Sequence, residues 1–322
     1  MACERAPGGF EPLESGFSTR IRVDDLVDAF ALCLAWLGGR LPLRTLHALG
    51  GAFGHYAWRF RKRDRRNTIV NLNLLKLHEP GLARRFDARQ ALVEMGKSLF
   101  EVAKVWSGRP ERALAMVREV EGAGHFEQAL ASGQGVIIAA PHLGCWELLS
   151  YWLAERTPLA IVYKPPRNQA LEPLLIKARG ASKVEQIRAE GAGVRSIYRR
   201  LGAGGVVGIL PDQQPRKGEG VFATFFGIDA LTMVLVPRLA ERTGATVLFA
   251  FAERLPQAAG FRIHIRPAPE GIADADLVVA CTAMNRGVEQ CVRIAPEQYQ
   301  WHYKRYSISP PGPKRNFYKS WE

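Results

Sequence analysis

The chain has 322 residues, of which 47% are hydrophobic and 23% charged, so it can bury a sizeable core and is not disordered as a whole. Its formal net charge of +13 predicts an anionic partner, and composition alone leaves nucleic acid, anionic lipid and an acidic carrier protein open. Five cysteines without a Cys-x-x-Cys pair argue against a disulfide framework and a zinc ribbon, and indicate reduced thiols facing the cytosol.

The N-terminal region divides into a tail and an apolar, strongly basic segment. Residues 1–20 are polar and lack an apolar core, so we expect a loose tail and no signal peptide. Residues 21–66 are expected to form a membrane-associating helical segment, because the apolar stretches 26–38 and 46–58 precede six cations within residues 59–66. At an anionic lipid surface each cation contributes on the order of 1 kcal/mol.

How this segment meets the membrane stays open. Neither apolar stretch reaches the roughly twenty residues that a spanning helix needs, which favours a helix lying in the membrane plane. Trp36 and Trp58 would then lie at headgroup level. The same pattern also fits a buried core hairpin with a solvated basic face.

The remaining chain, residues 67–322, is expected to be one α/β domain. Short apolar runs alternate with amphipathic segments, which predicts a mainly parallel central sheet flanked by helices, with an antiparallel hairpin near residues 251–261. Strands are predicted at 135–140, 159–162, 205–210, 246–251 and 261–265. Helices are predicted at 67–77, 91–106, 148–154, 171–178, 194–201, 234–242 and 280–294.

One predicted strand delivers a histidine and a glutamate to a turn. The run 135–140 is β-branched in its middle, as is typical of a strand covered on both faces. Pro141 ends its ladder because it has no N–H to donate. His142 therefore lies at the carboxyl end of a strand, just before a helix that contains Glu147. In α/β sheets this is where ligands bind.

His142 and Glu147 are five residues apart, so they can touch only if His142 lies off the helix. A glutamate on one imidazole nitrogen would fix the tautomer, leaving the other nitrogen to take a proton from an attacking hydroxyl. This is two thirds of a catalytic triad whose nucleophile comes from the substrate. The alternative is a helix-capping histidine beside a solvated glutamate. The strand, the proline turn, Gly144 and Trp146 together favour the catalytic interpretation.

The stretch 141–147 resembles the His-x4-Asp/Glu signature of the lysophospholipid acyltransferase superfamily. Its His-x-Gly-x-Trp-Glu form is similar to the lipid A biosynthesis (late) acyltransferase branch. Further blocks match that branch in order and spacing, at 163–168, Arg179, 211–214, 225–227 and 301–305. Gln214 departs from the pattern, since many members carry another acid there.

This resemblance implies an acyltransferase that moves a fatty acyl chain from an acyl carrier protein thioester to a hydroxyl of a lipid A precursor. It implies His142 as general base, Glu147 as its orienting partner, no cofactor, and a location at the cytoplasmic face of the inner membrane. One alternative keeps the chemistry but changes the acceptor to a lysophospholipid, a glycolipid or an amino-acid lipid. An alternative of another class is a non-catalytic protein that binds a membrane surface.

Five further residues are candidates for substrate binding. Asp212 and Gln213 follow the apolar strand 205–210; alone, Asp212 fits a turn or cap, whereas the resemblance implies that it orients the sugar acceptor or an arginine. Arg179 fits a favourable charge at a helix C-terminus, or, by resemblance, a ligand for phosphate or the thioester oxygen. Lys164 and Arg167 lie in a proline-stiffened loop that either holds acidic groups or is solvated.

Aromatic residues supply the candidates for an acyl pocket: Trp146, Phe222, Phe225 and Phe226. The apolar stretch 221–227 is predicted to be a loop that lines a fatty-acyl tunnel or fills the core. Cys145 is interpreted as a buried thiol rather than an acyl-enzyme nucleophile.

Other site classes lack support in the sequence. A metal site is not expected, because the chain has no His-Glu-x-x-His and no acidic cluster. A nucleotide site is not expected without a Walker loop or a dinucleotide fingerprint after a strand. Nucleic acid is not expected as a partner, because the basic charge lacks an RNA-binding aromatic motif.

Overall fold

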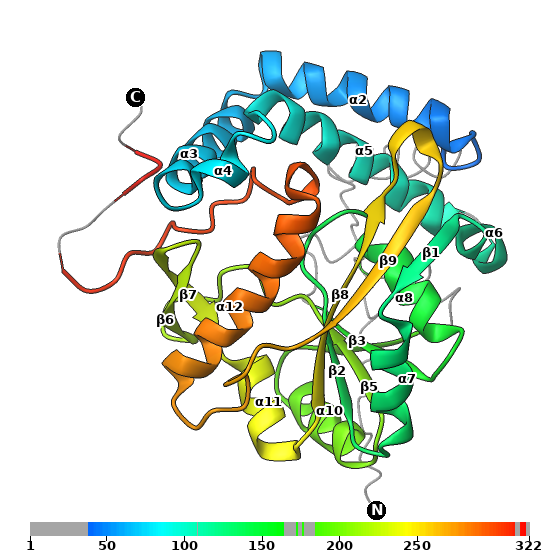
Figure 1. Ribbon diagram of the computed structural model, residues 1–322, viewed down its shortest axis with the longest axis vertical. Coiled ribbons are helices and arrows are strands. Elements are labelled where there is room, and N and C mark those ends of the chain that lie inside the picture. The colour runs from blue at the N-terminus through cyan, green and yellow to red at the C-terminus, as the bar shows by residue number, and fades with distance from the viewer. Residues whose placement is uncertain are drawn as a thin grey trace, which may run out of the picture.

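A seven-stranded sheet forms the centre of the molecule (Figure 1). The computed structural model describes residues 38–107, 109–163, 172, 176, 184–312 and 316–319. The strand order is β1-β9-β8-β2-β5-β3-β4, and all neighbours pair in parallel except β8 with β9. The strands are β1 (Val117–Glu121), β2 (Val136–Ala139), β3 (Leu159–Tyr163), β4 (Glu185–Arg188), β5 (Val206–Ile209), β8 (Thr246–Arg254) and β9 (Phe261–Pro267). The mainly parallel sheet and the antiparallel hairpin predicted from the sequence are confirmed.

Helices cover both faces of this sheet. Those before the first strand are α2 (Leu43–Phe60), α3 (Lys62–His78), α4 (Pro80–Ala83), α5 (Ala88–Ser107) and α6 (Pro110–Leu114). Those that follow are α7 (Ala123–Ala131), α8 (Trp146–Ala154), α10 (Ala192–Gly202), α11 (Leu235–Thr243) and α12 (Leu277–Ile294). The helix predicted at 171–178 lies outside the described residues, apart from Glu172 and Ile176.

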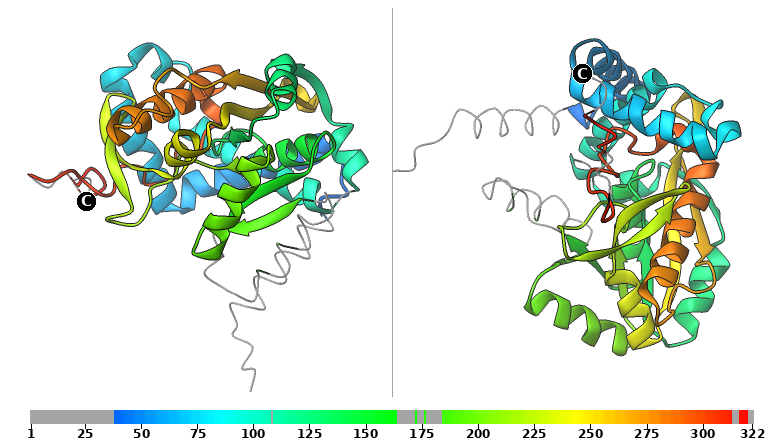
Figure 2. Two further views of the ribbon diagram at one scale, coloured as in Figure 1. Left: turned by 90° about the horizontal axis from the view of Figure 1, so that it is seen from below. Right: turned by 90° about the vertical axis from the view of Figure 1, so that its left-hand side faces the viewer.

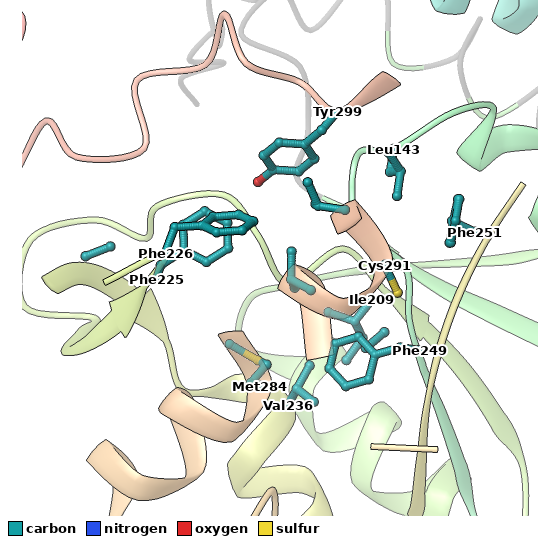
Figure 3. Packing of buried hydrophobic residues seen from close by; sticks show 14 of the residues in the cluster. Leu143, Ile209, Phe225, Phe226, Val236, Phe249, Phe251, Met284, Cys291 and Tyr299 are labelled. Carbon is teal, nitrogen blue, oxygen red and sulfur yellow. The ribbon is translucent and has the colours of Figure 1, made fainter. Parts of the chain in front are cut away.

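The sheet separates two hydrophobic cores. All four residues of β2 are buried, and they alternate between the cores because side chains of a strand point to opposite faces. Ile137 packs with α11 and α12, in the core that Figure 3 shows through Val236 and Met284. Ile138 packs in the other core with α7 and α8. A strand covered on both faces was the sequence prediction for this segment, and it is confirmed.

Four strands, β1, β4, β6 and β7, were not predicted from the sequence. β1 and β4 are edge strands with mostly exposed polar residues, so they lack the apolar run that marks a strand. The stretch predicted as a loop forms β6 (Gly220–Phe225), which pairs with β7 (Ile228–Met233) beside the main sheet (Figure 2). Phe226 and Gly227 join them with φ values of 47° and 77°, as a two-residue hairpin turn with positive φ at both positions requires.

The apolar stretch at 46–58 lies within α2, which packs along α5 at one end of the molecule (Figure 1). A Cβ added to Gly54 would lie 2.4 Å from Val93 Cα, and one added to Gly96 would lie 2.1 Å from the Gly50 carbonyl oxygen. Glycine is therefore required for the two backbones to approach this closely. The predicted boundary at Arg66 falls within α3.

Residues 1–37 lie outside the described part of the chain, so the apolar stretch at 26–38 is described only at Gly38. Among the described residues, no helix has both the length and the hydrophobicity needed to cross a membrane.

Candidate active site

The loop between β2 and α8 is fixed from two directions. Gly144 forms a bridge to Ala252 at the end of β8, and its φ of +59° leaves an added Cβ only 2.1 Å from the Ala252 carbonyl oxygen. On the other side Leu143 bridges Tyr299, and the Gln300 N–H donates to the His142 carbonyl oxygen at 3.2 Å. His142 is thus held off the helix, in a turn that only glycine at position 144 can form without strain.

The His142 imidazole is hydrogen-bonded to Asp212. Its Nδ1 lies 2.8 Å from Asp212 Oδ1, and its backbone N–H donates to Asp212 Oδ2 at 3.0 Å. The two residues follow β2 and β5, which are parallel neighbours, so their carboxyl ends present both side chains at one edge of the sheet. Asp212 was predicted to orient a sugar or an arginine; the structure instead places it against the imidazole.

The charge state of Asp212 determines the tautomer of His142. Burial raises the pKa of this carboxyl, but the charge of His142 and the hydrogen bonds from its ring and backbone outweigh burial, so the pKa lies below its ordinary value. An ionised carboxylate only accepts hydrogen bonds, so Nδ1 carries the proton and Nε2 keeps its lone pair. Nε2 is therefore the nitrogen that can act as a base.

Gln213 faces that second nitrogen. Its Nε2 lies 3.2 Å from His142 Nε2 and 3.1 Å from Gln300 Oε1, so the amide donates to both acceptors. This arrangement agrees with the tautomer set by Asp212. An acceptor hydroxyl that gives its proton to His142 Nε2 has to replace the Gln213 amide there.

Glu147 does not hold the imidazole, which corrects the predicted pairing. It lies in the first turn of α8, is 4% exposed, and accepts a hydrogen bond from the Trp106 indole N–H at 3.1 Å. The partners of the two ring nitrogens are Asp212 and Gln213 instead. The physical reason is the sheet order, which brings the carboxylate after the neighbouring strand directly to Nδ1.

A cavity of about 730 Å³ opens at His142, Glu147 and Gln213. Its wall includes residues of both cores, such as Ile209 of one core and Ile138 of the other. On the α8 side the wall contains apolar side chains, which are Ile138, Leu149, Leu153, Leu159 and Ile161. Such a wall suits an alkyl chain.

The predicted acyl-pocket aromatics divide between cavity and core. Trp146 lines the cavity, and its ring centroid lies 5.4 Å from that of His142. Phe225 and Phe226 are 2% exposed, and their ring centroids lie 4.8 Å apart in the core, near Tyr299 (Figure 3). Of the two alternatives for this stretch, these side chains fill the core. Phe222 also lies away from the cavity wall, because the hairpin turns this segment towards α12.

Three predicted binding residues, Lys164, Arg167 and Arg179, lie outside the described residues. Cys145 is fully buried, and burial raises its pKa well above the ordinary value, so the thiol stays protonated at neutral pH. In the described part of the chain, no group of three or more His, Cys, Asp or Glu residues is arranged to hold a metal ion.

Sequence reasoning missed a buried charge cluster behind the His142 loop. Arg254, at the end of β8, contacts Glu94 and Glu101 of α5, and its Nη2 donates to Ser98 Oγ at 2.8 Å. His47 Nε2 of α2 lies 2.6 Å from Glu101 Oε1. Burial lowers the pKa of Arg254, but the two glutamates outweigh burial and raise it, so the guanidinium stays charged.

This cluster supports the loop directly. Ser98 Oγ donates to the Gly144 carbonyl oxygen at 3.3 Å. The side-chain amide of Gln298 is hydrogen-bonded to the Arg254 backbone, and the backbone carbonyl of Gln298 accepts from the Gly144 N–H. The sequence pattern that could have indicated this cluster is Glu94, Ser98 and Glu101, which are spaced by four and three residues and so share one helix face.

The family and the relatives that the chain matches below are all described as acyltransferases. The family model described as bacterial lipid A biosynthesis acyltransferase matches residues 15–307. The lipid A biosynthesis lauroyltransferase of Escherichia coli (strain K12) is 29% identical over 285 residues, covering 86% of this chain and 90% of its own. The palmitoleoyltransferase of the same pathway and organism is 27% identical over 284 residues, covering 88% and 92%. A phosphatidylinositol mannoside acyltransferase of Mycobacterium tuberculosis (strain CDC 1551 / Oshkosh) is 31% identical over 139 residues, covering 41% and 42%.

Proposed function

The chain belongs to the bacterial lipid A biosynthesis acyltransferase family, and we propose that it transfers a fatty acyl chain from an acyl carrier protein thioester to a hydroxyl of a lipid A precursor. The observation that carries this proposal is the His142 imidazole, whose Nδ1 is held by buried Asp212 and which, with Gln213 at its Nε2, lines a cavity of about 730 Å³. A base directed into a partly apolar cavity fits transfer of an acyl chain to a hydroxyl.

The proposed reaction needs no nucleophile from the protein. His142 Nε2 takes the proton of the acceptor hydroxyl as its oxygen attacks the thioester carbonyl carbon. The tetrahedral intermediate then collapses, the carbon–sulfur bond breaks, and the imidazolium returns the proton to the leaving thiolate. Asp212 stabilises the imidazolium through its 2.8 Å contact with Nδ1, as the buried aspartate of a catalytic triad does.

Glu147 has a different role in this proposal from the one expected of it. Its carboxylate lines the cavity beside His142 without bonding the ring, so its charge adds to the field that favours the imidazolium. The apolar α8 wall takes the acyl chain. The buried, protonated thiol of Cys145 supports direct transfer over an acyl-enzyme.

The proposed location is the cytoplasmic face of the inner membrane, with α2 in contact with anionic lipid. The face of α2 that points away from α5 exposes Leu49 by 44%, Tyr56 by 53% and Phe60 by 61%. These side chains recur at helical spacing and follow one stripe, which we call the α2 stripe. Arg59 and Arg63 are exposed at its end, so the surface combines apolar burial with attraction to anionic headgroups.

The proposed function is tested by supplying defined substrates to the purified full chain. Acyl carrier protein thioesters serve as donors, and the acceptors are a lipid A precursor, a lysophospholipid and a mannosylated glycolipid, with mass spectrometry of the products. The proposal expects ester formation on the lipid A precursor in preference to the others. Preferential acylation of the glycolipid would transfer the same chemistry to another acceptor, and no ester on any acceptor would refute the proposed activity.

A further inference from the structure

The cavity at His142 has a second wall that differs from the apolar one. On the α10–α11 side it is lined by Tyr198 and by two arginines of α11, Arg238 and Arg242, which follow one another by one helical turn. Four residues of helix rise by about 6 Å, so two guanidinium groups of these side chains can reach one small anion. The cavity thus offers an apolar wall and a cationic wall, both continuous with the base.

In the described part of the chain, near carboxylates neutralise little of the positive charge of Arg238 and Arg242. Among the described residues, no carboxylate forms an ion pair with Arg238. Arg242 Nε lies 3.9 Å from its chain neighbour Glu241, and the two side chains are 63% and 45% exposed, so this contact contributes little. The third arginine of the wall, Arg216, differs because it lies 3.8 Å from both Glu190 and Glu219.

We propose that Arg238 and Arg242 form a phosphate subsite, which binds the phosphate group of a substrate whose reacting group lies at His142. The inference rests on the proposed acyl transfer and adds a binding determinant to it. Guanidinium groups bind phosphate oxygens through paired N–H donors, which a hydrated lysine cannot match. A phosphate held on this wall leaves the α8 wall to the alkyl chain, so the two walls of the cavity take chemically different parts of the substrates.

Two sources of phosphate fit this chemistry. One is the phosphodiester that joins the thioester arm to its carrier protein, and the other is a phosphate group on the lipid acceptor. Either would lie on the α11 wall while the thioester carbonyl or the acceptor hydroxyl lies at His142 Nε2. Paired substrates with and without phosphate separate the two sources.

The kinetic test uses Arg238→Gln, Arg242→Gln and the double variant of the full chain. Arg286→Gln is the matched control, because Arg286 is an exposed helix arginine on α12 that does not line the cavity. The donor pair is an acyl carrier protein thioester and the same acyl chain on N-acetylcysteamine. The acceptor pair is a phosphorylated lipid A precursor and its dephosphorylated form.

The subsite predicts that each single variant raises KM by about tenfold for the phosphate-bearing member of one pair. KM for its phosphate-free partner and kcat stay near the wild-type values, and the affected pair identifies the source. An equal rise for both members, or no change in either pair, would overturn the proposal. Thermal unfolding of each variant at the wild-type temperature excludes a loss of folding.

A second measurement does not depend on turnover. Phenylglyoxal modifies accessible arginines, and mass spectrometry of the digested full chain locates the adducts. Inorganic phosphate should protect Arg238 and Arg242 and leave Arg286 reactive. Equal modification with and without phosphate would contradict the subsite, even if the wild type transferred acyl chains. If the wild type transferred none, the proposed activity would fail while this protection still decided the subsite.

Discussion

At the scale of single residues, Asp212 carries the strongest structural argument. Asp212→Asn keeps the shape of the side chain but removes the charge that fixes the His142 tautomer. We therefore expect kcat to fall by about 10²- to 10⁴-fold. Steady-state kinetics of acyl transfer measure this, with the exposed Asp229→Asn as the control for loss of a carboxylate. A variant with more than half of the wild-type kcat would show that Asp212 does not act through the imidazole.

The site also shows which residue assignments a sequence supports. His142 and Glu147 were predicted as site residues because they follow an apolar strand and its proline turn. Asp212 and Gln213 also follow an apolar strand, but only the family resemblance gave them a role in the site. The choice of carboxylate at His142 Nδ1 could not be made, since Asp212 is 70 positions away and reaches the ring only through the order of β2 and β5. A spacing of five residues made Glu147 the nearer candidate in sequence, although it is not the nearer one in space.

At the scale of elements, the turn from β2 into α8 depends on Gly144. Gly144→Ala places a Cβ 2.1 Å from the Ala252 carbonyl oxygen at a φ of +59°, so we expect the free energy of unfolding to fall by roughly 2 kcal/mol or more. Urea unfolding measures this. Gly124→Ala in α7 is the control, because nothing lies within 4 Å of an added Cβ there. Its stability should stay unchanged or rise by up to about 1 kcal/mol.

If the two alanine variants unfolded at the same urea concentration, the close approach of the loop to β8 would not be a constraint. The same approach explains why activity should fall along with stability in Gly144→Ala. A displaced loop carries His142 away from Asp212 and Gln213, and misplacement by about 1 Å already costs 10²-fold in rate.

The α2 stripe gives a prediction for the proposed contact with lipid. Replacing Tyr56 and Phe60 by serine should weaken binding to anionic vesicles, because the loss of exposed apolar surface removes interfacial burial. Val278→Ser on α12 is the matched control, since Val278 is 49% exposed on another element. Vesicle sedimentation measures both. Equal sedimentation of the double variant and the wild type would place the lipid contact elsewhere.

Point substitutions are preferable to truncation for this test. α2 packs on α5 through Gly50, Gly54 and Gly96, and its His47 bonds buried Glu101. Deleting the helix would expose a charged cluster that supports the His142 loop, so a deletion would confuse membrane release with unfolding. The sequence could indicate the apolar stretch of α2. It could not indicate the glycine face that packs on α5, because α5 is not next to α2 in the chain.

The elements themselves were predictable to the extent that they are buried. Strands covered on both faces, such as β2 and β5, consist of apolar residues, so they can be recognised in the sequence. The edge strands β1 and β4 carry exposed polar residues, so they cannot be recognised in the same way. The β6–β7 hairpin was not predicted, because the first residue of its turn is the bulky Phe226. It has a positive φ, which is usually found at glycine or asparagine.

At the scale of the whole molecule, His302 predicts an acid-dependent loss of stability. Burial lowers its pKa to about 4 from the ordinary 6.5, and its buried Nδ1 has no hydrogen-bond partner among the described residues. Between these values the unfolded chain binds a proton that the folded chain does not. The free energy of unfolding therefore falls by on the order of 3 kcal/mol as the pH drops from 6.5 to 4.

Urea unfolding across this pH range, compared between the wild type and His302→Gln, isolates the contribution. The variant should lose less stability than the wild type between pH 6.5 and 4, and the two curves should run parallel above pH 6.5. Parallel curves over the whole range would mean that His302 is not buried in its neutral form.

The proposed acyl transfer depends on His142 Nε2 as its base. The most direct measurement is the rate of ester formation by purified, folded His142→Ala protein with acyl carrier protein thioester and lipid A precursor, followed by mass spectrometry of the product. We expect the rate to fall by about 10²-fold or more, because loss of a positioned base removes that much. A variant that retained more than a tenth of the wild-type rate would contradict the assignment of His142 as the base.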